Sequence, residues 1–290
     1  MAVLDVALAE SPADEPGRAD DADRIALGLY PPRRIIVDVL LRTDGDAVIA
    51  IGQASHAWVS GQLAQAWGNE RIPAPEPREE VCLAAAQHDV GMAQWDLRPA
   101  LNPDTGRPQS FLEMPLPVHV GLWTAAPGRL LTQSRYAALL VSMHGTALYA
   151  HRDTSSMSPV GRELVAGYLD SQRAFQDDLA VRLGADRSQL RRNQQLLWIW
   201  DAISLALCLR WDPLSLAEVP APHGQLDLDL ELRADGADQF TVDPWPFAHA
   251  PVRVRCEGAR LDGRYETEPE LRRALRQAPI VTLEFTLTPS

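Results

Sequence analysis

Lysine is absent from this 290-residue sequence, because all 27 of its basic residues are arginines. Its absence excludes Schiff-base catalysis and any lysine that grips a substrate phosphate. Cysteine is scarce: Cys82, Cys208 and Cys256 lie far apart and form no C-x-x-C pair, which predicts buried free thiols rather than a disulfide framework. The glycine-rich phosphate loops and the G-x-S-x-G element of serine hydrolases are also missing.

Basic charge and long apolar runs are in short supply as well. The 39 acidic residues outnumber the 27 basic ones, and the net charge of −12 disfavours nucleic acid and anionic membranes as partners. No segment reaches the roughly 18 consecutive apolar residues of a membrane helix, and the N-terminus lacks the basic start of a signal peptide. We therefore expect a cytoplasmic protein with a small-molecule substrate. The sequence leaves its oligomeric state open.

The pattern of apolar residues divides the chain into three parts. Residues 1–30 have the composition of a disordered or loosely packed tail. Residues 31–213 begin with a predicted hairpin over 34–41 and 47–51. Helical periodicity follows over 55–67, 78–89, 119–123, 135–151, 159–183 and 188–211, with a proline-rich loop at 97–117. Residues 214–290 predict strands over 226–232, 252–256 and 281–287 and a short helix over 268–277, either as a separate domain or as a sheet packed on the helices.

Four histidines and two aspartates stand in or beside apolar helical segments: His56, His88, Asp89, His119, His144 and Asp201. Asp201, within LLWIWDAISLALC, is the clearest case, because an ionised carboxylate there costs several kcal/mol unless a cation or strong donors meet it. Imidazole and carboxylate ligands suit Fe, Mn, Zn or Co. Six ligands are too many for one catalytic ion with an open position, but they fit two ions about 3.5–4 Å apart.

The order of these residues, H…HD…H…H…D, resembles that of the HD superfamily of metal-dependent enzymes. The flanking segments QASHAWVSGQLAQAWG, HDVGMAQWD, TGRPQSFLEMP and LLVSMHG are similar to an uncharacterised bacterial branch of it, domain-of-unknown-function family 3891. The resemblance spans roughly residues 34–287. It implies a mainly α fold, with an HD-like helical metal-binding core over residues 31–213. Together with the β-rich C-terminal portion, the expected class is α+β.

The resemblance also implies how the ligands divide between two metal ions. His56, His88 and Asp201 would hold one ion, and His119 and His144 would hold the other. Asp89 would bridge the two through its carboxylate oxygens. Iron is the first expectation for both ions, with manganese or zinc as the alternatives.

Other residues near the predicted ligands are weaker candidates. Gln53, one helical turn before His56, and Trp95, soon after Asp89, are candidate active-site residues together with Asp89 itself. A surface position for Gln53 and a packed indole for Trp95 explain them equally well. Of the remaining histidines, His151 is a candidate neighbour of the ligands, whereas His223 and His249 are expected at the surface.

The resemblance leaves three kinds of function open. Many hydrolases of the superfamily carry a lysine soon after the HD pair, where this chain has Met92; Arg98, Arg152 or Arg162 would have to replace that charge. This difference favours an O2-dependent di-iron oxygenase acting on a small organic substrate. The alternative is a metal-dependent phosphohydrolase. A degenerate HD fold kept as a binding module ranks third, because none of the six ligands is missing.

Overall fold

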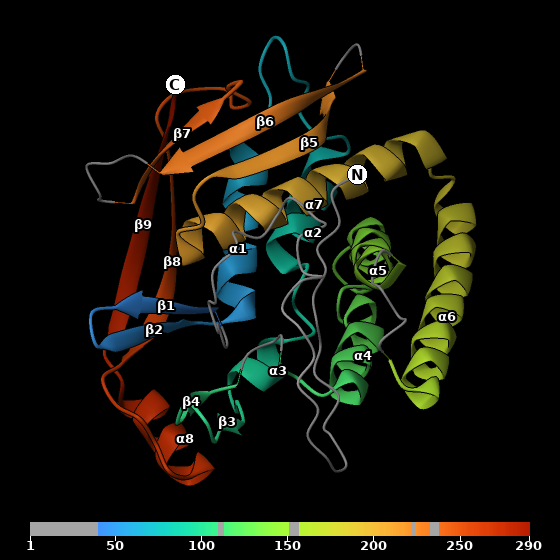
Figure 1. Ribbon diagram of the computed structural model, residues 1–290. Helices are drawn as coiled ribbons and strands as arrows, with labels where there is room; N and C mark the ends of the chain where they lie inside the picture. Colours follow the sequence, from blue (N-terminus) through green and yellow to red (C-terminus); the bar gives the residue numbers. More distant parts are fainter. Residues whose placement is uncertain (1–39, 110–112, 151–156, 222–223, 233–237) are drawn as a thin grey trace.

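A computed structural model describes residues 40–109, 113–150, 157–221, 224–232 and 238–290 of the chain. The predicted tail (1–30) and the first residues of the predicted hairpin (34–39) lie outside the described residues. Figure 1 shows a curved sheet on one side of the molecule and most of the helices on the other.

Two long helices lie where the apolar periodicity predicts them. α6 (Pro159–Leu183) begins after Ser158, whose hydroxyl accepts the N–H of Gly161. α7 (Arg187–Leu209) begins after Asp186, which caps it in the same way. The other helices are α1 (Gln53–Ala66), α2 (Arg78–Gln87), α3 (Ala93–Asp96), α4 (Leu116–Ala125), the 3-10 turn η1 (Pro127–Arg129), α5 (Arg135–Ala150) and α8 (Glu268–Gln277).

Seven strands form one mixed sheet in the order β1-β2-β8-β9-β7-β6-β5. They are β1 (Leu40–Asp44), β2 (Ala47–Ile51), β5 (Leu214–Ala221), β6 (Gly224–Leu232), β7 (Gln239–Asp243), β8 (Val252–Leu261) and β9 (Ile280–Pro289). Neighbouring strands are antiparallel except β7 and β9, which run parallel. A second, two-stranded sheet consists of β3 (Leu101–Asn102) and β4 (Arg107–Pro108).

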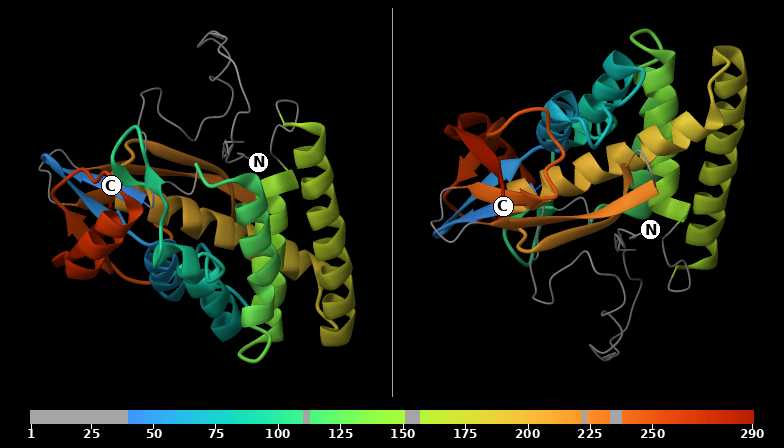
Figure 2. Two further views of the ribbon diagram at one scale, coloured as in Figure 1. Left: turned by 90° about the horizontal axis from the view of Figure 1, so that it is seen from below. Right: turned by 90° about the horizontal axis from the view of Figure 1, so that it is seen from above.

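The sheet curls around α7. This helix contacts both edge strands, β1 and β5, while α1 packs against the inner strand β8. On the side away from the sheet, α2 packs between α1 and α5, and α5 is covered by α6. Figure 2 shows the same order of layers from above and below, with α6 farthest from the sheet.

The expectation of a mainly helical, HD-like core with a β-rich appendage is wrong, although the chain is α+β. The hairpin β1–β2, expected to belong to the helical part, is hydrogen-bonded to β8 and completes the seven-stranded sheet. The sheet therefore takes strands from both sides of residue 213 and encloses α7. The physical reason for the error is that alternation marks single strands, whereas the pairing of Val48 with Leu261 links segments more than 200 residues apart.

Candidate metal centre

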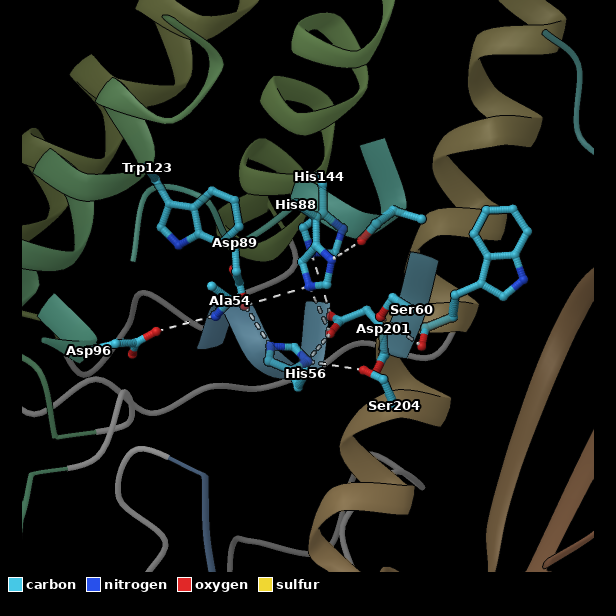
Figure 3. A network of polar contacts seen from close by, with 12 residues as sticks. Ala54, His56, Ser60, His88, Asp89, Asp96, Trp123, His144, Asp201 and Ser204 are labelled. Atoms are coloured by element: carbon cyan, nitrogen blue, oxygen red, sulfur yellow. Dashed lines mark hydrogen bonds and ion pairs between the residues drawn. The ribbon is translucent and has the colours of Figure 1, made fainter. Parts of the chain in front are cut away.

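Four helical segments bring five of the predicted ligands together. His56 lies in the first turn of α1, His88 and Asp89 directly follow α2, His144 lies in α5 and Asp201 in the middle of α7. All five side chains are buried. Figure 3 shows His56, His88 and Asp201 pointing toward one another from their separate elements.

Close helix packing allows these side chains to meet. Gly61 of α1 faces Ala86 of α2, and a Cβ added at Gly61 would lie only 2.5 Å from the Cβ of Ala86. Real Cβ atoms do not approach that closely, so only glycine lets α1 and α2 pack at this distance. His56 on α1 therefore lies close to the His88–Asp89 pair at the end of α2.

The ring nitrogens and carboxylate oxygens of the cluster lie within hydrogen-bond or ion-pair distance of one another. Nε2 of His56 lies 2.7 Å from Oδ2 of Asp89, and Nε2 of His88 lies 3.2 Å from Oδ1 of Asp201. Oδ2 of Asp89 is 3.5 Å from Nε2 of His88, and Oδ2 of Asp201 is 3.5 Å from Nε2 of His144. His56, His88 and Asp201 form a buried group that can hold a metal ion, with one ligand atom of each within 4.8 Å of the others.

Hydrogen bonds fix which nitrogen of each imidazole faces the cluster. Nδ1 of His88 donates to the carbonyl oxygen of Ala85 at 2.9 Å, so the lone pair of its neutral ring is on Nε2. The hydroxyl of Ser204 donates to the carbonyl of Asp201 at 2.8 Å. Ser204 therefore accepts from Nδ1 of His56 at 3.0 Å, which leaves the lone pair of His56 on Nε2 as well.

Both Nε2 lone pairs therefore face carboxylate oxygens. Two acceptors at 2.7 Å or 3.2 Å repel each other unless a proton or a metal cation lies between them. Nε2 of His88 has no hydrogen-bond partner in the part of the chain that the structure describes. The residues fit a cation whose ligands are neutral imidazoles and ionised carboxylates.

Without a metal, this environment draws a proton into the cluster. Burial acts to lower the pKa of His88, but the carboxylates of Asp89 and Asp201 outweigh it and raise that pKa to about 9. Burial acts to raise the pKa of Asp89 and of Asp201, but the neighbouring histidines outweigh it and lower both values. The cluster therefore holds positive charge beside two ionised carboxylates at neutral pH.

The structure does not bring His119 into this cluster. The indole N–H of Trp123 donates to Nε2 of His119 at 3.2 Å, and Nδ1 of His119 is hydrogen-bonded to the hydroxyl of Tyr149. The ring of Trp123 contacts His119 on one side and His144 on the other, with centroids 6.2 and 5.7 Å away. Gly145 makes room for it, since a Cβ there would lie 2.6 Å from the indole.

The weaker candidates lie at the edge of the cluster or elsewhere. Gln53 is buried at the start of α1, and Trp95 of α3 is partly buried against the hydrophobic core. Arg162 hydrogen-bonds to the carbonyl of Met157, and Arg98 is exposed. His249 is exposed as expected, whereas His151, Arg152 and His223 lie outside the described residues.

Sequence reasoning missed Ser204, which orients His56. Its signal is present in the sequence, because Ser204 follows Asp201 by one helical turn in an otherwise apolar segment. A small polar residue at that spacing lies on the same face of the helix as the aspartate.

Comparison with known proteins gives a family but no activity. The model of the family described as "Protein of unknown function (DUF3891)" matches residues 39–263. No curated protein and no solved structure matches the chain. Among the described residues, no helix combines the length and apolar character needed to cross a membrane.

Proposed function

The chain belongs to the DUF3891 family, and we propose that it is a metal-dependent hydrolase in which His56, His88, Asp89 and Asp201 bind one divalent cation. The observation that carries the proposal is the pair of imidazole Nε2 atoms whose lone pairs face buried carboxylate oxygens. The order H…HD…D of these four residues also resembles the metal-binding order of the HD superfamily.

The charge of the cluster favours a divalent cation. Two buried carboxylates carry two negative charges, which a divalent ion balances when both imidazoles are neutral. The donor set of two nitrogens and two carboxylates suits Mn²⁺, Fe²⁺ or Zn²⁺. Such an ion would supply Lewis-acid chemistry, lowering the pKa of coordinated water toward neutrality and polarising an ester bond.

Residues of the chain hold the ligands in their binding geometry. Ser204 and the carbonyl of Ala85 fix the tautomers of His56 and His88. Nε2 of His144 lies 3.5 Å from the second oxygen of Asp201 and orients that carboxylate. Contacts of this kind maintain ligand basicity and ring orientation in metal sites. We take a phosphoester of a small organic molecule as the substrate class.

A dinuclear iron centre with O2-dependent chemistry is the second candidate. His144 favours it, because its Nδ1 is buried with no hydrogen-bond partner among the described residues. A second ion held by His144 and His119 would require His119 to leave Trp123 and Tyr149. We therefore rank the single-ion hydrolase first.

Metal stoichiometry and turnover separate these candidates. The protein, stripped with a chelator and reloaded with Mn²⁺, Fe²⁺ or Zn²⁺, should contain one ion per chain by elemental analysis. His88→Ala and Asp201→Ala should lose it, whereas His249→Ala, at an exposed position, should keep it. The loaded protein should release p-nitrophenol from bis(p-nitrophenyl) phosphate without oxygen. Two irons per chain with oxygen uptake would favour the second candidate, and metal binding without turnover would favour a binding module.

A further inference from the structure

Helix α1, which carries His56, begins without a cap of its own. The first N–H groups of a helix have no partner within the helix, and the N-cap residue Gly52 has no side chain to offer. The partner comes from α3: Oδ2 of Asp96 accepts the backbone N–H of Ala54 at 3.2 Å, and the backbone of Gln53 also favours the ionised carboxyl of Asp96 and acts to lower its pKa. Figure 3 shows this carboxylate directed at Ala54, beside the cluster.

Gly52 leaves the space that this contact needs. A Cβ added there would lie 2.9 Å from Oδ2 of Asp96 and 3.3 Å from its carboxyl carbon. The backbone of Gly52 is extended with φ −67°, a conformation open to any residue. A side chain at position 52 would therefore displace the carboxylate of Asp96.

Asp96 connects two segments that carry ligands. Ala54 precedes His56 by two residues in the first turn of α1. Asp96 is tied to Asp89 through consecutive turns, in which Met92 N–H donates to Asp89 O at 2.8 Å and Asp96 N–H donates to Met92 O at 3.0 Å. The side-chain contact thus closes a bridge between the start of α1 and the segment that follows α2.

We propose that Asp96 is a positioning residue that holds His56 at ligand distance from Asp89 and thereby sets the affinity of the site for its cation. This inference rests on the proposed metal site. Residues that orient metal ligands typically change metal affinity 10- to 100-fold when they are replaced. Asp96 acts through the N–H groups of α1, so an uncharged acceptor of the same shape should serve equally well.

The test measures Zn²⁺ affinity of the full chain by competition with a chromophoric chelator. Asp96→Ala should bind Zn²⁺ about 10-fold more weakly than the wild type, while Asp96→Asn should stay within about 3-fold, because its amide oxygen still accepts the Ala54 N–H. Gly52→Ala, which leaves the carboxylate in the chain but displaces it, should weaken binding as Asp96→Ala does.

Asp186→Ala provides the matched control. It also removes an aspartate that caps a ligand-bearing helix, but Asp186 lies 15 residues before Asp201 and far from the cluster along α7. Its urea midpoint should fall while its Zn²⁺ affinity stays that of the wild type. Wild-type affinity in Asp96→Ala and Gly52→Ala, or an equal loss in Asp96→Asn and Asp96→Ala, would overturn the inference. A wild type that binds no divalent cation would instead overturn the proposed function.

Discussion

The pKa of His88 predicts how the stability of the metal-free protein depends on pH. This pKa rises from 6.5 to about 9 on folding. With about 1.4 kcal/mol for each pKa unit, protonated His88 stabilises the folded metal-free protein by about 3 kcal/mol. Because the folded value is the higher one, the stabilisation is complete below pH 6.5 and is lost as the pH rises through 9.

Other perturbed groups of the site act in a different pH range. The lowered pKa values of Asp89 and Asp201 mean that their stabilisation is present above about pH 4 and is lost in acid. Burial raises the pKa of Asp96 to about 7, so ionisation of Asp96 destabilises the folded protein progressively as the pH rises from about 4 to 7. Among these groups, only His88 titrates between pH 7 and 9.

The assay is urea unfolding followed by tryptophan fluorescence at pH 7 and pH 9, with and without a chelator. With the chelator, the wild type should lose most of the 3 kcal/mol of stabilisation by protonated His88 between pH 7 and pH 9. Saturating Zn²⁺ should abolish this loss, because the cation takes the place of the proton. His88→Asn should remove the loss, whereas His249→Gln, at an exposed position, should retain it. An equal loss of unfolding free energy between pH 7 and pH 9 in the wild type and in His88→Asn would refute the reasoning.

Two further predictions concern packing and charge around the site. Gly61→Ala should destabilise the protein by about 2 kcal/mol and lower its metal content, because the new Cβ would lie 2.5 Å from Ala86. The matched change Gly121→Ala, in a helix where nothing lies within 4 Å, should stabilise it by up to about 1 kcal/mol. Asp96→Asn should raise the free energy of unfolding at pH 8 by about 4 kcal/mol, since the pKa of Asp96 rises from 3.8 to about 7 and the folded protein disfavours its ionised form. This gain in unfolding free energy should vanish at pH 4. Urea unfolding at pH 8 and pH 4 measures it, and a gain of equal size at both pH values would contradict the prediction.

Local elements were predictable where the apolar pattern is long. The expected helix over 159–183 matches α6 and the expected strand over 281–287 lies within β9, because many residues contribute to each periodicity. Strands β5 and β7 were missed: β5 contains Pro220 and Glu218, and β7 has only five residues. The enclosure of α7 by the sheet depends on pairings between distant segments, which no local pattern encodes.

Five of the six residues singled out in the sequence come together in the structure, whereas His119 is hydrogen-bonded to Trp123 and Tyr149 instead. Apolar surroundings made Asp201 costly unless something bound it, and this argument needs no fold. The same reasoning treated His119 as equivalent to His144. The structure separates them through Trp123, whose indole donates to His119 while its ring packs on His144. Sequence spacing does not reveal which ring nitrogen a neighbouring donor already occupies.

Asp201 and the partly buried Asp238 differ in whether residues of the chain balance their charge. The carboxylate of Asp238 accepts from the guanidinium groups of Arg42 and Arg210 at 2.7–2.8 Å, so its charge is met within the protein. Asp201 has no guanidinium partner among its described contacts; it faces the imidazole of His88, whose tautomer directs the Nε2 lone pair toward it. An apolar residue in the middle of α7 would pack there at a lower cost in free energy. Stability alone therefore does not explain Asp201, whereas the proposed cation would.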